Sequence, residues 1–172
     1  MAAHYELVPT GQGDGFTSML SEAACRQIQA LMSKYPRKRS ALIPSLQIAQ
    51  KEAGFLSHNT ICEIAKLFDL SPSEVNGVAS FYTMLYKKPV GKYVIQVCTN
   101  ISCLICNAEG IMSHLAAKLG IRPGETTPDG KYTLVEVECL GSCGTSPVIQ
   151  INDNYYEDLT PEKVDRILDS LE

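Results

Sequence analysis

Apolar residues follow a helical period through the first half of the chain, recurring three and four positions apart. This period predicts helices over about 19–35, 40–54, 57–68 and 71–85. Ser40 and Ser57 stand where side chains cap the second and third of these helices. Ser71-Pro72-Ser73-Glu74 has the sequence of a capping box with proline in the first turn. Short helices with one apolar face each predict a small bundle or a docking layer.

From residue 91 onward the apolar residues gather in short runs that are typical of buried strands. The predicted strands cover 93–97, 132–138, 148–151 and 155–156, and the predicted helices cover about 107–119 and 160–171. Gly120 is the expected stop of the first of these helices, and Thr160 is the expected cap of the second. The order β-α-β-β-α is typical of a compact thioredoxin-like fold.

We therefore predict an α+β protein in which an N-terminal helical bundle precedes a thioredoxin-like domain. The expected parts are a flexible arm at 1–18, a helical docking domain at 19–90 and the thioredoxin-like domain at 91–172. The run Lys87-Lys88-Pro89-Val90-Gly91 ends the last helix of the bundle and serves as the linker.

Charge is divided unevenly between the two halves. Residues 1–90 hold nine Lys and Arg against seven Asp and Glu, whereas 91–172 hold six against twelve. The acidic second half argues against nucleic acid as a partner. No apolar stretch approaches the roughly 20 residues that a membrane span needs, and the start lacks the pattern of a signal peptide. We expect a cytoplasmic protein, or one that faces the cytoplasm.

The chemistry of the chain is concentrated in two cysteine pairs. Cys98 and Cys103 have four residues between them, and Cys139 and Cys143 have three. Cys98 and Cys139 each end a predicted strand, so neighbouring strands would bring all four sulfurs to one edge of a sheet. Each iron of a 2Fe–2S cluster needs two thiolates, and two pairs of cysteines suit that group.

Three other interpretations of the cysteines stay open at this point. Cys98, Cys103 and Cys106 also match the spacing of a plant-type ferredoxin, although a strand directly before Cys98 is unlike its long irregular loop. Cys103 and Cys106 form a C-x-x-C pair typical of a dithiol oxidoreductase. Structural zinc also accepts four thiolates, but zinc knuckles favour two-residue spacing.

The remaining candidates have plain structural explanations. Cys25 and Cys62 lie on helical segments away from the pairs and are expected to be small helix residues. Pro147 follows the second pair immediately before a strand, where thioredoxin-like folds often have a cis proline, and the sequence does not decide the isomer.

Two motifs carry a resemblance to a known family. Val97-Cys98-Thr-Asn-Ile-Ser-Cys103 and Glu138-Cys139-Leu-Gly-Ser-Cys143-Gly, followed by Pro147, resemble the thioredoxin-like 2Fe–2S subunit of NADH:quinone oxidoreductase, respiratory complex I. Val75-Asn-Gly-Val-Ala-Ser-Phe81-Tyr82 in the helical half is similar to the same family. Cys106 departs from the family pattern and leaves a ligand exchange with Cys103 open.

The resemblance implies one 2Fe–2S cluster held by Cys98, Cys103, Cys139 and Cys143. It also implies an electron carrier beside a flavoprotein subunit, which binds FMN and oxidises NADH, and among the other peripheral-arm subunits. The helical half would dock that flavoprotein, as part of a complex on the cytoplasmic face of the inner membrane. On this resemblance the thiolates supply ligation only, and we expect no catalytic acid, base or nucleophile in this chain. Homologous subunits occur in NAD-linked hydrogenases and formate dehydrogenases, so the parent complex stays open.

Overall fold

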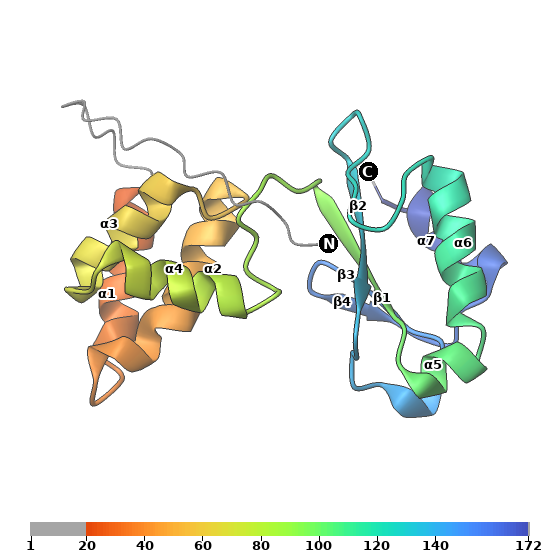
Figure 1. The fold of residues 1–172 in the computed structure, drawn as a ribbon, viewed down its shortest axis with the longest axis horizontal. Helices are drawn as coiled ribbons and strands as arrows, with labels where there is room; N and C mark the ends of the chain where they lie inside the picture. The colour runs from red at the N-terminus through yellow and green to blue at the C-terminus, as the bar shows by residue number, and fades with distance from the viewer. Residues whose placement is uncertain (1–19, 172) are drawn as a thin grey trace. The chain divides into compact units, whose positions relative to one another are not determined.

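The computed structural model describes residues 20–171, which are drawn in colour in Figure 1. The chain divides between Lys87 and Lys88 into two compact units, and each unit has its own apolar core. The arm predicted at 1–18 lies outside the described residues.

The helical unit contains α1 (Glu22–Met32), η1 (Lys38–Ala41), α2 (Leu42–Ala53), α3 (His58–Phe68) and α4 (Pro72–Phe81). Two predicted caps are confirmed. The Ser57 hydroxyl accepts a hydrogen bond from the Thr60 N–H, and Ser71 and Glu74 form a complete capping box before α4. The helices enclose a core whose largest fully buried members include Ile28, Leu46, Ile64, Phe68 and Val75.

Two details of the helical prediction are wrong. Ser40 lies inside the 3-10 turn η1 and does not cap α2. No side-chain cap is formed there, because η1 runs directly into α2 and the Leu42 N–H donates to the Arg39 carbonyl. Helix α4 ends at Phe81, because Tyr82 adopts an extended backbone, so Leu85 joins the core from a loop.

The second unit is built on a mixed sheet. Its elements are β1 (Tyr93–Cys98), α5 (Ile101–Ile105), α6 (Ala108–Leu119), β2 (Tyr132–Val137), η2 (Cys143–Thr145), β3 (Ile149–Ile151), β4 (Asn154–Tyr156) and α7 (Pro161–Asp169). Within the described residues the strand order is β2-β1-β3-β4. β1 is parallel to β2 and antiparallel to β3, and β3 is antiparallel to β4.

Helices α6 and α7 cover one face of this sheet (Figure 1). Apolar residues of both helices and of strands β1, β2 and β3 form the core, including Ile95, Ile111, Leu115, Leu134, Ile149 and Val164. The predicted stop at Gly120 and the predicted cap at Thr160 are both present. The predicted α+β class is therefore confirmed, whereas the short helix α5 was not predicted.

The Ser146–Pro147 peptide bond before β3 is cis. None of the helices between residues 20 and 171 is long and apolar enough to cross a bilayer.

Candidate metal centre

The ends of β1 and β2 bring two cysteine-bearing segments together. Cys98 is the last residue of β1, and its register partner is Val137, the last residue of β2. Cys139 follows two residues after that strand ends. Because parallel strands end at the same edge of a sheet, the first cysteine segment (98–106) and the second cysteine segment (139–147) meet there.

Cys98 is the centre of the thiol contacts. Its side chain forms hydrogen bonds with the thiols of both Cys103 and Cys139. Cys98 and Cys103 are only 3% and 2% exposed, and Ala108 and Val148 pack against them. The structure thus places two of the other predicted ligands, Cys103 and Cys139, beside Cys98.

The two buried thiols differ in acidity. Burial disfavours the Cys98 thiolate, but hydrogen bonds from the backbone N–H groups of Asn100 and Leu140 and from two neighbouring thiols outweigh it. The pKa of Cys98 therefore lies below its usual range. Burial raises the pKa of Cys103, despite a hydrogen bond with Ser146. A buried thiolate supported by backbone N–H groups is the form in which cysteine binds metal.

Cys103 and Cys143 are linked through Ser146. The Ser146 Oγ lies 3.4 Å from the Cys103 Sγ and donates to the Cys143 carbonyl oxygen over 3.1 Å. The Cys143 side chain is exposed at the start of η2. Ser146 therefore ties the turn that carries Cys143 to the buried pair.

The Cys139 thiol is also exposed, but its orientation is defined. The Gly141 N–H donates to the Cys139 Sγ over 3.3 Å. Gly141 has a φ of 76°, a left-handed conformation that favours glycine. The backbone of the second cysteine segment thus turns a donor towards sulfur, as clusters and metal thiolates require.

The donor set fits a 2Fe–2S cluster in its chemistry. Two segments that face one another each supply two thiols, and each iron of such a cluster takes two. Within residues 20–171, no three or more His, Cys, Asp and Glu side chains converge closely enough to hold one metal ion.

Sequence reasoning missed three residues that shape this site. Asn100 caps α5, Ser146 links Cys103 to Cys143, and Glu157 accepts hydrogen bonds from the hydroxyls of Ser142 and Thr145. The hydroxyl-rich run Ser142-Cys-Gly-Thr-Ser146 is a signal that could have found Ser146, because it predicts a turn held by side chains.

The C-x-x-C pair is divided between two environments. Cys103 is buried and contacts Cys98 and Ser146. Cys106 is exposed at the C-terminal cap of α5. The observed contacts therefore make Cys98, not Cys106, the thiol that adjoins Cys103.

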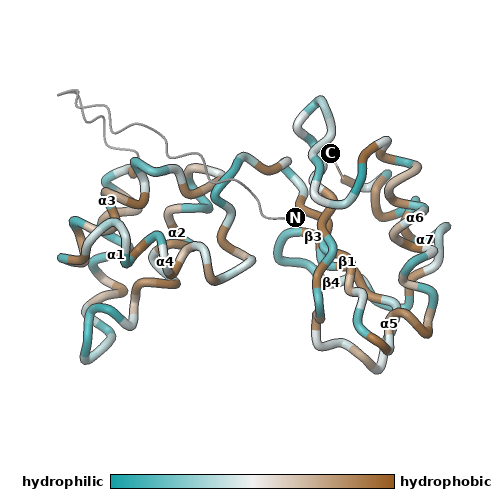
Figure 2. The backbone as a smooth tube through the Cα atoms, in the orientation of Figure 1, coloured by the Kyte–Doolittle hydropathy of each residue, from teal (hydrophilic) through white to brown (hydrophobic). Residues whose placement is uncertain are grey.

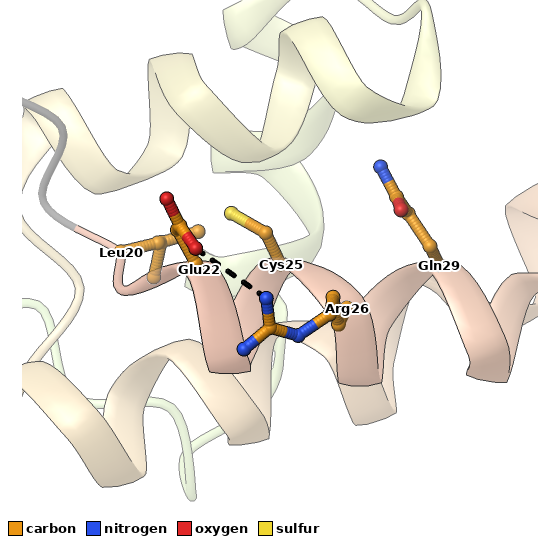
Figure 3. A pocket seen from close by; sticks show the side chains of 5 residues that line it. All are labelled: Leu20, Glu22, Cys25, Arg26 and Gln29. Carbon is orange, nitrogen blue, oxygen red and sulfur yellow. Dashed lines mark hydrogen bonds and ion pairs between the residues drawn. The ribbon is translucent and has the colours of Figure 1, made fainter.

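The two cysteines of the helical unit, Cys25 and Cys62, interact with residues of that same unit. Cys25 lies on α1 beside a shallow surface pocket, where Arg26 forms a 3.4 Å ion pair with Glu22 (Figure 3). Burial and then nearby carboxylates raise the pKa of Cys25, so its thiol stays protonated. The Cys62 Sγ lies 3.5 Å from the His58 Nε2 one turn earlier on α3.

Comparison with known proteins agrees with this architecture. A solved NAD+-reducing NiFe hydrogenase in its H2-reduced state has the same fold, with a TM-score of 0.68 at 24% identity. That match covers 76% of this chain and 22% of the hydrogenase chain.

Sequence relatives extend over most of the chain. An NADH-quinone oxidoreductase subunit of Rhizobium meliloti is 43% identical, over 84% of this chain and 86% of the relative. The NADH-quinone oxidoreductase subunit 2 of Thermus thermophilus is 44% identical, over 84% and 81%. The family model for thioredoxin-like 2Fe–2S ferredoxins matches residues 28–172, a range that includes both cysteine segments. This chain belongs to the thioredoxin-like 2Fe–2S ferredoxin family.

Proposed function

We propose that this chain is an electron-carrying subunit of an NADH:quinone oxidoreductase, with one 2Fe–2S cluster held by Cys98, Cys103, Cys139 and Cys143. The observation that carries the proposal is the meeting of the two cysteine segments at the ends of β1 and β2. Family membership supports the cluster. The names of the relatives in Rhizobium meliloti and Thermus thermophilus support the parent complex.

Different residues of the site would shield such a cluster from water and stabilise its thiolate ligands. Cys98 and Cys103 exclude water from one side, because both are buried among apolar neighbours. The backbone N–H groups of Asn100, Leu140 and Gly141 donate to sulfur and stabilise the thiolates. When bound, a 2Fe–2S cluster accepts and releases one electron. Such a role needs no acid, base or nucleophile from this chain.

The partner in this proposal is a flavoprotein subunit that binds FMN and NADH at the cytoplasmic face of the membrane. The helical unit offers an apolar contact for it, because Phe81 is 79% exposed and Met84 is 49% exposed. Figure 2 shows a second hydrophobic segment at α5, where Ile101 and Ile105 are exposed. Phe81→Glu should reduce recovery of the flavoprotein with a tagged chain, whereas Tyr35→Glu, at another exposed aromatic of that unit, should not.

The first experiment is an anaerobic visible and EPR spectrum of the purified chain, before and after dithionite. We expect broad visible absorption, iron and acid-labile sulfide in equal amounts, and about one spin per chain after reduction. Serine at any of the four proposed ligands should remove or alter the spectrum, while Cys106→Ser, Cys25→Ser and Cys62→Ser leave it unchanged. A colourless chain after anaerobic reconstitution would contradict the proposal.

A separate experiment tests the parent complex. The assembly isolated through a tagged chain should oxidise NADH with a quinone as acceptor. An assembly that reduces NAD+ with hydrogen or formate, and has no activity with quinone, would contradict this part of the proposal while leaving the cluster intact.

A further inference from the structure

The second cysteine segment is held in place by residues of β4 and of the segment that follows it. The Tyr155 hydroxyl donates to the Leu140 carbonyl oxygen over 3.0 Å. Next to it, the Asp158 N–H donates to the Thr145 carbonyl oxygen over 2.7 Å. The two exposed cysteines therefore lie on a turn whose shape depends on residues 155–159.

Glu157 makes two contacts with this turn through a single carboxylate oxygen. Its Oε1 accepts hydrogen bonds from the Ser142 hydroxyl and, over 2.8 Å, from the Thr145 hydroxyl. Ser142 and Thr145 lie on either side of Cys143 in the turn, and their hydroxyl oxygens are 2.9 Å apart. One carboxylate thus fixes both flanks of Cys143.

Helix capping does not account for this arrangement. Ser142 occupies the N-cap position of η2, yet its side chain makes no capping hydrogen bond. The hydroxyl bonds to Glu157 instead. Hydrogen bonds from Ser142 and then Thr145, helped by the charge of Lys163, lower the pKa of Glu157, so the carboxylate is ionised at neutral pH.

We propose that Glu157 is a positioning residue for the cluster, which holds the turn of Cys143 and lowers the reduction potential through its fixed negative charge. The inference rests on the proposed function, because it assumes a cluster on Cys139 and Cys143. Reduction adds negative charge to the cluster, and a neighbouring carboxylate disfavours that change. Removing a residue that orients a metal ligand without binding the metal commonly lowers the metal affinity by about 10-fold to 100-fold.

Two substitutions separate position from charge. Glu157→Gln keeps an oxygen acceptor for Ser142 and Thr145 but removes the charge. It should retain iron as the wild type does and show a higher midpoint potential. Glu157→Ala removes both, and it should release iron to a chelator on the order of 10-fold faster.

The matched control is Glu125→Gln. Glu125 accepts a hydrogen bond from the Arg122 N–H in the connection that enters β2, whereas Cys139 follows the other end of that strand. This control removes the same charge elsewhere, and it should leave both the potential and iron release unchanged.

The potentials are read by EPR-monitored titration and iron release by chelator absorbance. Equal potentials in wild type and Glu157→Gln, or wild-type iron release from Glu157→Ala, would overturn the inference. If Glu157→Ala fails to fold, the potential of Glu157→Gln decides alone. A wild-type chain without a 2Fe–2S spectrum would overturn the proposed function itself, which is a different result from unchanged variants on a loaded wild type.

Discussion

The two cysteine pairs lie at the same edge of the sheet but are organised by different forces. Cys98 and Cys103 are enclosed by apolar side chains and by the short helix α5. Cys139 and Cys143 are exposed on a turn that hydroxyls and one carboxylate hold. One half of the site therefore depends on hydrophobic packing and the other half on polar contacts, so different perturbations should damage them.

The largest expected difference between the pairs is chemical reactivity in the chain without a cluster. Iodoacetamide should modify Cys139 and Cys143 on the order of 100-fold faster than Cys98 and Cys103, because the buried pair reacts only after local opening. The lowered pKa of Cys98 does not compensate, since its thiolate is out of reach. Peptide mass spectrometry over time measures each rate. Similar rates for Cys98 and Cys139 would show that the first pair is not enclosed.

The next largest effect should come from truncating a side chain that packs against the buried cysteine pair. Val148→Ala removes a side chain that is 1% exposed and packs against Cys98 and Cys103, and should cost about 1–3 kcal/mol of unfolding free energy. Urea unfolding of the cluster-free chain measures the loss. Leu140→Ala is the control, because Leu140 is only partly buried and should cost less. An equal loss of unfolding free energy in both variants would show that packing around the buried pair does not depend mainly on Val148.

Loss of the cap on α5 should be smaller. The Asn100 side chain accepts a hydrogen bond from the Ile101 N–H over 2.9 Å, and Asn100→Ala should destabilise the first cysteine segment by about 1 kcal/mol. Hydrogen exchange of residues 98–106 should speed up, while exchange of residues 139–147 stays the same. Faster exchange in both segments would mean that they open as one unit.

Acid should affect the second cysteine segment selectively. The folded-state pKa of Glu157 is lowered mainly by Ser142 and Thr145, so its contribution to stability is complete above about pH 4.3, the value for an unfolded glutamate. That contribution is lost as the pH falls through the lower folded-state pKa.

The expected change is a rise in hydrogen exchange of 139–147 between about pH 6 and pH 3, normalised to the unfolded peptide. Residues 98–106 should not follow this rise. Glu157→Gln is the control, because an amide does not titrate and the variant should lose the pH dependence. A variant that keeps the full dependence would assign the effect to another carboxylate.

Sequence prediction succeeded where the physical signal is local. The capping box at Ser71 and the apolar runs of β1 and β2 depend on neighbours in the chain, and all are present. The helix α5 was missed because its five residues complete little more than one turn and show no apolar period. Ser40 failed as a cap because the turn before α2 already supplies the backbone partners.

The candidate site shows the same limit. Pairing of Cys98 with the second cysteine segment was predictable, because both follow strands that a thioredoxin-like order places side by side. Glu157 was not predictable, because it reaches Ser142 and Thr145 only after β3 and β4 have reversed the chain. The isomer of the Ser146–Pro147 bond, which is cis, was likewise not decided by the sequence.

The strand order has a consequence for the time at which the site is made. Cys98 is synthesised before α6, a connection and β2, and Glu157 follows later still. The first two thiols therefore enter the nascent chain before Cys139 and Cys143, and contacts between segments distant in sequence form slowly. The full set of four thiols exists only once synthesis has passed Cys143, so assembly of the proposed cluster follows the synthesis of both cysteine segments.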